Sequence, residues 1–176
     1  MRTSSLALMA LLSVLVIASH DALGAPTSQT VPSPDRTLKA VITLVGPERK
    51  ESRVEIQRND GNTLCIQDYS SADGEHGLVV TEEMWTPDSR FFVYSTSSSG
   101  GHQPYHSPIY FYSRRSNRVR DIEELTHRMV IEQAPDPEFK VVPPHSVTLV
   151  TSNNGLDKQE ITLVNLYTGT VSHSTK

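Results

Sequence analysis

Residues 86–95 read TPDSRFFVYS, a polar turn followed directly by a run of aromatic and β-branched residues. In the turn, Pro87 fixes its own φ angle, and the side chain of Asp88 can bond to the backbone that follows it. The apolar run after the turn is typical of a β-strand. The stretch therefore predicts a tight reversal that leads into a strand of a sheet.

The same pattern occurs twice more along the chain. SPDRTLKAVI at 33–42 aligns with TPDSRFFVYS without a gap, and PPHSVTLVTS at 143–152 is a poorer copy. In each case a second strand-like run and a polar turn follow. Repeats of this size suggest stacked four-stranded units.

Short runs rich in β-branched and aromatic residues fill most of the chain, and turn-forming clusters separate them. We expect strands at 38–44, 53–58, 63–69, 77–85, 90–96, 108–114, 146–152 and 160–166. Asn, Asp and Gly tolerate the positive φ angles of tight reversals and place hairpin turns in RNDGNT, RRSNRV, SNNGLDKQ and LYTGTV. The predicted fold is mainly β, with antiparallel sheets in an open or partial propeller or a compact β-sandwich.

One segment, DIEELTHRMVIEQ at 121–133, breaks the β pattern. Asp121 followed by Glu124 resembles a capping box with Asp in place of Ser or Thr, and the APDP sequence at the end stops a helix. Its apolar side chains fall on one helical face: Ile122, Leu125 and Met129. We therefore expect one short helix that packs this face against the sheet.

The sequence WTPDS at 85–89 resembles the W-S-P-D-G opening of the TolB-type β-propeller blade. The glycine of the family pattern is replaced by Arg36 in the first copy and by Ser89 in the second. The resemblance implies four-stranded blades, but closed propellers typically have about 4 to 8 of them. Three copies would form either a propeller fragment that closes by oligomerising or a compact sheet protein that shares only the turn. The helix and the irregular spacing favour the second.

The N-terminal segment has the order of a secretory signal peptide. Arg2 precedes an apolar run from Leu6 to Ala18, and small residues follow at Ala22 and Gly24. The run is shorter than the roughly 20 residues that a membrane-spanning helix needs. We expect cleavage after Gly24, so that the mature chain has no membrane span and is periplasmic or secreted. The mature chain contains no N-x-S/T sequon, which favours a bacterial envelope protein.

Behind the signal peptide (1–24), the proline-rich stretch APTSQTVPSP at 25–34 is expected to be an extended, poorly ordered lead-in. Residues 35–176 then form a single β-rich domain. The one cysteine, Cys65, cannot form an internal disulfide, and a net charge of −4 makes the chain a poor general binder of nucleic acid. The expected partner is an envelope or extracellular protein or a small ligand.

The segment between the strands at 90–96 and 108–114 is a connection of roughly a dozen residues, against about 2 to 5 in most hairpins. Long loops of this kind often have functional roles. Its polar and aromatic side chains form our candidate binding site: His102, Gln103, Tyr105 and His106, with Tyr110 on the following strand. Two further tyrosines adjoin it on the neighbouring strands: Tyr94 and Tyr112.

The same loop is a place where a metal or catalytic site could form. His102 and His106 could share an ion with His76 or a carboxylate, but Pro104 opposes the helix that would put an i, i+4 pair on one face. Ser99 lacks the G-x-S-x-G context of an activated serine.

Cys65 has no flanking base or cationic residues to activate its thiol. The sequence therefore favours a non-enzymatic binding module without a cofactor or bound metal. The alternative is a small metal-dependent or hydrolytic extracytoplasmic enzyme that uses the 97–107 loop.

Overall fold

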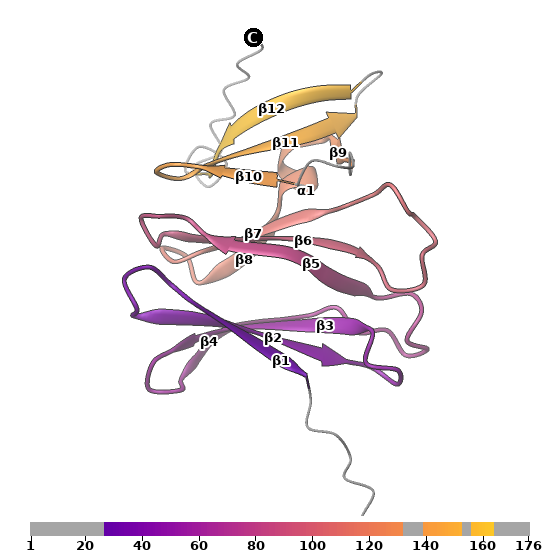
Figure 1. Ribbon diagram of the computed structural model, residues 1–176, viewed down its shortest axis with the longest axis horizontal. Coiled ribbons are helices and arrows are strands. Elements are labelled where there is room, and N and C mark those ends of the chain that lie inside the picture. Colours follow the sequence, from indigo (N-terminus) through magenta and orange to yellow (C-terminus); the bar gives the residue numbers. More distant parts are fainter. Residues whose placement is uncertain (1–26, 132–138, 153–155, 164–176) are drawn as a thin grey trace, which may run out of the picture.

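The computed structural model describes residues 27–131, 139–152 and 156–163, and the statements below concern these residues. The signal peptide expected at 1–24 and the LYTGTV turn lie outside them. The described residues form three antiparallel sheets, stacked as layers that do not close into a ring (Figure 1). The prediction of a mainly β fold with one short helix is confirmed.

Each of the first two sheets is a four-stranded meander. The first contains β1 (Ser28–Pro32), β2 (Leu38–Val45), β3 (Glu51–Arg58) and β4 (Thr63–Asp68). The second contains β5 (Leu78–Trp85), β6 (Phe91–Ser98), β7 (Ile109–Ser113) and β8 (Arg118–Asp121). The predicted RNDGNT and RRSNRV turns join the last two strands of these sheets, with Gly61 and Asn117 at positive φ.

The third sheet has a broken edge. β9 (Met129–Val130) and β10 (Phe139–Val142) both pair with β11 (Ser146–Ser152), while β12 (Leu156–Thr162) pairs along its other edge. All eight expected strands are present, although the last begins and ends a few residues earlier than predicted.

The sequence did not reveal four of the strands. Residues 28–32, expected to be poorly ordered, form β1 and pair with β2 over their whole length. Pro32 is compatible with this pairing because it lies at the end of an edge strand. The other three are β8, β9 and β10, each of at most four residues and therefore too short to show an alternating pattern.

The repeated turn joins the first two strands of both meanders with the same hydrogen bonds. The hydroxyl of Ser33 donates to Asp35 Oδ1 (2.7 Å) and accepts from the N–H of Leu38 (3.0 Å). The second turn repeats both contacts with Thr86, Asp88 and Phe91. The poorer copy at 143–145 lies in the corresponding place, between β10 and β11.

Side chains of these turns link neighbouring sheets. The N–H of Asp35 donates to Ser89 Oγ (3.0 Å), and His145 Nδ1 lies 3.1 Å from Asp88 Oδ2. The Trp85 indole N–H donates to the carbonyl of Val31 (2.9 Å) and holds β1 against the second sheet. The turns thus fasten the layers along one side of the stack.

β6 is buried on both faces because it lies in the middle layer, and its first four residues, 91–94, accordingly form a continuous apolar run. One face packs on the first sheet in a core of Leu38, Ala40, Ile42, Val54, Ile56, Trp85, Phe92, Tyr94 and Tyr112. The other packs on the third sheet in a core that includes Phe91, Val93, Phe111, Ile122, Phe139, Val147, Leu149 and Ile161. Burial of side chains of this size contributes about 1.5 to 3 kcal/mol each.

The helix α1 (Ile122–Thr126) is shorter than the 121–133 segment that was predicted. It begins as expected, because the Asp121 side chain accepts the N–H groups of Glu123 and Glu124. It ends where His127 adopts a left-handed conformation (φ 55°) and donates its N–H to the carbonyl of Glu123.

The predicted apolar face of the helix is correct only in part. Ile122 is fully buried, and Leu125 is half-buried against the same core. Met129 was wrongly assigned to this face: it lies in β9 and is 51% exposed. Pairing of β9 with β11 therefore prevails over the helical spacing of the apolar residues. In the described part of the chain, no helix is long and apolar enough to cross a membrane.

Candidate functional site

The long connection between β6 and β7 runs along one side of the stack (Figure 1). At its start, the N–H of Ser99 donates to the carbonyl of Gly77 (3.0 Å), which lies just before β5. At its end, His106 forms an isolated β-bridge with Ile131, and the N–H of Ser107 donates to Val130 (3.3 Å). The connection is long because it leaves the second sheet, contacts β9 and Ile131 beside the third sheet, and then leads back to the second sheet at β7. We call residues 99–107 the strap.

Glu51, the first residue of β3, fixes the start of the strap. Its side chain is fully buried, and its carboxylate accepts hydrogen bonds from the N–H (2.7 Å) and hydroxyl (2.5 Å) of Ser71. It also accepts the N–H of Gly77 (2.8 Å) and the hydroxyl of Ser99 (3.1 Å). Desolvation raises the pKa of this carboxyl, but the hydrogen bonds outweigh it, so the pKa of Glu51 is lowered. The ionised side chain thus joins the strap to the β4–β5 connection.

Two glycines allow these segments to approach so closely. A Cβ at Gly77 would lie 2.3 Å from Glu51 Oε1 and 2.3 Å from the carbonyl oxygen of Tyr69. A Cβ at Gly100 would lie 2.4 Å from the carbonyl oxygen of Glu75. A larger residue at Gly100 would therefore displace the strap from the β4–β5 connection, and one at Gly77 would displace that connection from Glu51.

His106 fixes the other end of the strap. Its Nε2 lies 2.9 Å from both carboxylate oxygens of Glu123 in α1, and its Nδ1 lies 2.7 Å from Gln103 Oε1. Glu123 Oε1 also accepts the N–H of Val130 in β9 (2.5 Å). Both ring nitrogens of His106 thus have a polar partner, one on the strap and one on α1.

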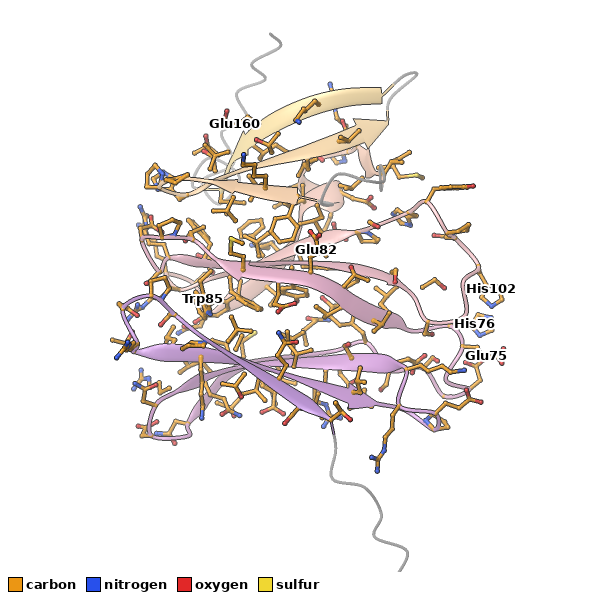
Figure 2. The ribbon with its side chains drawn as sticks, viewed as in Figure 1. Glu75, His76, Glu82, Trp85, His102 and Glu160 are labelled. Carbon is orange, nitrogen blue, oxygen red and sulfur yellow. The ribbon has the colours of Figure 1, made fainter. Side chains whose placement is uncertain are left out.

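The middle of the strap projects into solvent between these two anchors. Tyr105 is 74% exposed. His102 stacks on His76 of the β4–β5 connection, with ring centroids 5.2 Å apart and planes 19° apart (Figure 2). His76 Nδ1 in turn lies 2.6 Å from Asp73 Oδ2. The strap, which is held at both ends, therefore presents the phenol of Tyr105 and the imidazole of His102, and His76 adds a second imidazole from the β4–β5 connection.

The structure separates the five residues predicted for the binding site. His102, Gln103 and Tyr105 are exposed on the strap, whereas His106 is partly buried in its second anchor. Tyr110 lies elsewhere, on β7, where its ring packs against two others: Tyr69 (5.1 Å between centroids) and Tyr94 (5.6 Å).

Tyr94 and Tyr112, the adjoining aromatics, are fully buried between the first and second sheets. Their rings stabilise the core and do not face a partner.

The sequence did not reveal that the β4–β5 connection belongs to this site. Asp73 organises it by accepting the backbone N–H groups of Glu75 and His76. The sequence offered two signals for this connection: the cluster of turn-forming residues SSADGEHG at 70–77, and His76, a candidate metal ligand together with His102. Glu51 gave no signal, because its partners lie far from it along the chain.

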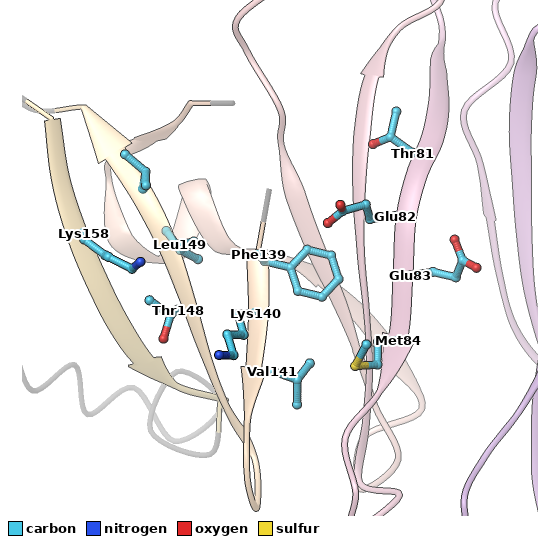
Figure 3. Close-up of a pocket in the computed structure, with 11 residues that line it drawn as sticks. Thr81, Glu82, Glu83, Met84, Phe139, Lys140, Val141, Thr148, Leu149 and Lys158 are labelled. Carbon is cyan, nitrogen blue, oxygen red and sulfur yellow. The ribbon is translucent and has the colours of Figure 1, made fainter. Parts of the chain in front are cut away.

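A groove of about 800 Å³ forms a second candidate site between β5 and β10 (Figure 3). Its lining residues come from strands of the second and third sheets: Thr81, Glu82, Glu83, Met84, Phe139, Lys140, Val141, Thr148, Leu149, Val150 and Lys158. Sequence reasoning did not find it, because it arises only from the stacking of two sheet edges.

The histidines of the strap do not converge, since His102 contacts His76 and His106 contacts Glu123. Within residues 27–131, 139–152 and 156–163, no three His, Cys, Asp or Glu side chains form a group that could hold a metal ion. Burial raises the pKa of the Cys65 thiol, which disfavours the reactive thiolate.

No protein family model matches the chain, and a comparison with curated proteins finds no significant match. The function is therefore inferred from the geometry and chemistry of the strap.

Proposed function

We propose that this protein is an exported, non-enzymatic binding module that holds an envelope or extracellular protein through the strap, with Tyr105 as the main contact. One observation carries the proposal: a tyrosine that is 74% exposed lies on a segment whose two ends are fixed by the carboxylates of Glu51 and Glu123. Binding loops that work from a rigid scaffold have this arrangement.

The anchors favour binding because they reduce its entropic cost. A mobile loop must be ordered when it binds, which opposes association, whereas the strap is already held by Ser99 and His106. A tyrosine side chain adds a large contact area with few rotatable bonds and a hydroxyl that can bond at the interface. These properties make Tyr105 suitable as an anchor in a protein interface.

The surroundings of Tyr105 also suit a protein partner. His102 and Gln103, which are exposed on the same strap, supply hydrogen-bonding groups beside Tyr105 along the chain. Protein interfaces commonly combine a central aromatic side chain with such a polar rim.

The proposed export of the protein and its proposed relationship to propeller blades have separate support. The order of charges, apolar residues and small residues before Ala25 supports export. The equivalent turns of the first and second sheets support a relationship to TolB-type propeller blades, with the three sheets as blade-like units of an open stack.

A comparative pull-down tests the proposed function. Immobilised wild-type protein and its Tyr105→Ala variant are exposed to an envelope extract of the source cells, and each captured protein is quantified by mass spectrometry. Ile66→Ala is the matched control, because Ile66 is also exposed (57%) but lies on β4. We expect one protein to be lost with Tyr105→Ala and kept with Ile66→Ala. Capture of the same set by all three proteins would refute the role of Tyr105.

A further inference from the structure

One side of the stack carries an excess of positive charge. Four connections of the first two sheets lie there, on the left in Figure 1: 33–37, 58–62, 86–90 and 114–118. We call these residues the turn face. They include six arginines and three aspartates, although the whole chain has a net charge of −4. The charges of the protein are therefore distributed unevenly.

Hydrogen bonds join the four connections into one surface. The N–H of Arg114 donates to the carbonyl of Arg90 (3.0 Å), and its guanidinium donates to Asp35 Oδ2 (2.5 Å). The side-chain amide of Asn59 donates to the carbonyl of Arg36. The 33–37 turn thus contacts each of the other three connections, since the N–H of Asp35 also bonds to the second turn at Ser89.

The aspartates of the turn face are engaged by their own surroundings, whereas most of its arginines face solvent. Asp60 accepts the N–H and the side-chain amide of Asn62 (2.9 Å each), and Asp88 accepts the hydroxyl of Thr86 (2.6 Å). Asp35 pairs with Arg114, as described above. The other five arginines are exposed: Arg36, Arg58, Arg90, Arg115 and Arg118.

The opposite side of the stack has the opposite excess. Residues 46–50, 69–77 and 121–128 contain six acidic residues against three lysines and arginines, and Figure 2 shows Glu75 there beside His76 and His102. The eight-residue strands β2 and β6 separate the two sides by about 26 Å. This distance exceeds the Debye length of about 8 Å at physiological ionic strength. A partner at the turn face therefore experiences its local positive charge and not the net charge of the chain.

We propose that the turn face docks on an anionic phospholipid membrane, with its exposed arginines bound to lipid phosphates. The planar guanidinium group matches the geometry of a phosphate and can bond to it through two N–H groups. A membrane presents phosphates over a plane, so that arginines from all four connections are engaged at once. Basic residues close to an anionic membrane each add to the attraction.

The apolar side chains of the surface favour a membrane over a protein at this face. Protein interfaces are usually centred on buried aromatic or apolar anchors. In the described part of the chain, the exposed large apolar residues lie outside the turn face: Ile66, Met84, Tyr105 and Met129. Docking is thus peripheral, without insertion. The strap lies on the opposite side, away from the membrane, and the inference does not depend on what the strap binds.

Sedimentation with lipid vesicles tests the proposal. The chain from Ala25 onward is used, because the apolar run from Leu6 to Ala18 would itself bind lipid. We expect binding to vesicles of phosphatidylglycerol and phosphatidylcholine in equal parts, a loss of roughly tenfold in affinity as salt is raised, and no binding to phosphatidylcholine alone. Equal binding to both kinds of vesicle would overturn the proposal. So would binding to soluble polyphosphate without binding to vesicles, which would identify a soluble polyanion as the partner.

Charge-matched variants locate the docking surface. Arg58→Gln with Arg118→Gln removes two exposed charges from the turn face and should weaken vesicle binding roughly 25-fold, since each basic residue near an anionic membrane contributes about fivefold. Arg49→Gln with Lys50→Gln removes the same charge from the opposite side and should change binding by less than about twofold. Circular dichroism checks the fold of each variant. Equal weakening by the two pairs would overturn the assignment.

A spin-labelled lipid in the same vesicles tests the orientation on wild-type protein, so that variant folding does not matter. Amide resonances of Arg36, Gly61 and Arg115 should broaden strongly, while those of Glu75 and His102 should not. Stronger broadening at Glu75 and His102 than at the turn face would overturn the proposal.

Discussion

The carboxylate of Glu51, at the start of β3, accepts a hydrogen bond from the hydroxyl of Ser99, which begins the strap after β6 (3.1 Å). The same carboxylate holds Ser71 and Gly77, so one buried charge positions two surface segments. Because the Glu51 side chain is the acceptor in all of these hydrogen bonds, the site stabilises its ionised carboxylate.

Glu51→Gln should destabilise the protein by about 2 to 4 kcal/mol, because an amide group would face N–H and hydroxyl donors in a buried place. Urea unfolding followed by circular dichroism measures the change. Glu48→Gln is the control, since Glu48 lies nearby on the surface and forms an exposed ion pair with Lys50. That change should stay within about 0.5 kcal/mol. Equal effects of the two substitutions would contradict the role of Glu51.

Stability should fall in acid because the pKa of Glu51 is lowered in the folded state. Between that pKa and the unfolded value of about 4.3, the unfolded chain binds more protons, so stability rises with pH and its full contribution is present above that window. Thermal unfolding from about pH 6 to pH 3 should therefore give a steeper loss of Tm for the wild type than for Glu51→Gln. Parallel curves would show that Glu51 does not contribute to the acid response.

Asp35 should contribute to the same acid response through the first turn. The hydrogen bond from the Ser33 hydroxyl, together with Arg114 and Thr37, outweighs desolvation and lowers the pKa of its carboxyl. Asp35→Asn should thus flatten the pH dependence of Tm without affecting the anchor of the strap, which hydrogen exchange of the strap amides can check.

Arg36→Gly should stabilise the protein by about 0.5 to 1 kcal/mol, because Arg36 holds a φ of 57° that an L side chain disfavours. Ser89→Gly relieves a similar φ of 61° but removes the bond from Asp35 to Ser89 Oγ, so its gain should be smaller. Arg118→Gly, on exposed β8, is the control and should destabilise by roughly 0.5 to 1 kcal/mol. Thermal unfolding measures the change in Tm for each of the three glycine variants. If Arg36→Gly instead lowered Tm, the interactions of the Arg36 side chain would contribute more to stability than the strain of its positive φ angle costs.

His106→Ala should cost about 1 to 3 kcal/mol, because it leaves the carboxylate of Glu123 without its imidazole partner. His102→Ala on the same strap should stay within about 0.5 kcal/mol, since His102 is exposed. Urea unfolding measures both. Equal changes in the free energy of unfolding for His106→Ala and His102→Ala would show that His106 does not anchor the strap.

Local sequence patterns predicted most of the fold. The alternation and composition of the longer strands placed them to within a few residues, and Pro87 and Asp88 marked a turn that the structure contains. Short strands escaped detection because two to four residues carry no period, and Met129 was misplaced because pairing with β11 overrides helical spacing.

The candidate site was less predictable, because it depends on contacts between distant parts of the chain. The length of the 97–107 loop drew attention to this segment, but no local feature revealed that Glu51 anchors its start or that Glu123 holds its end. Burial of Tyr94 and Tyr112 follows from the position of their strands in the middle layer, which the strand pattern alone does not give.

Photocrosslinking at position 105 tests the proposed binding function most directly. A photoreactive phenylalanine analogue replaces Tyr105 in the source cells, and the same analogue at the exposed position of Ile66 serves as the control. The account predicts a discrete adduct with one envelope or extracellular protein from position 105 and none from position 66. An absence of adducts from position 105, or the same adducts from both positions, would contradict it.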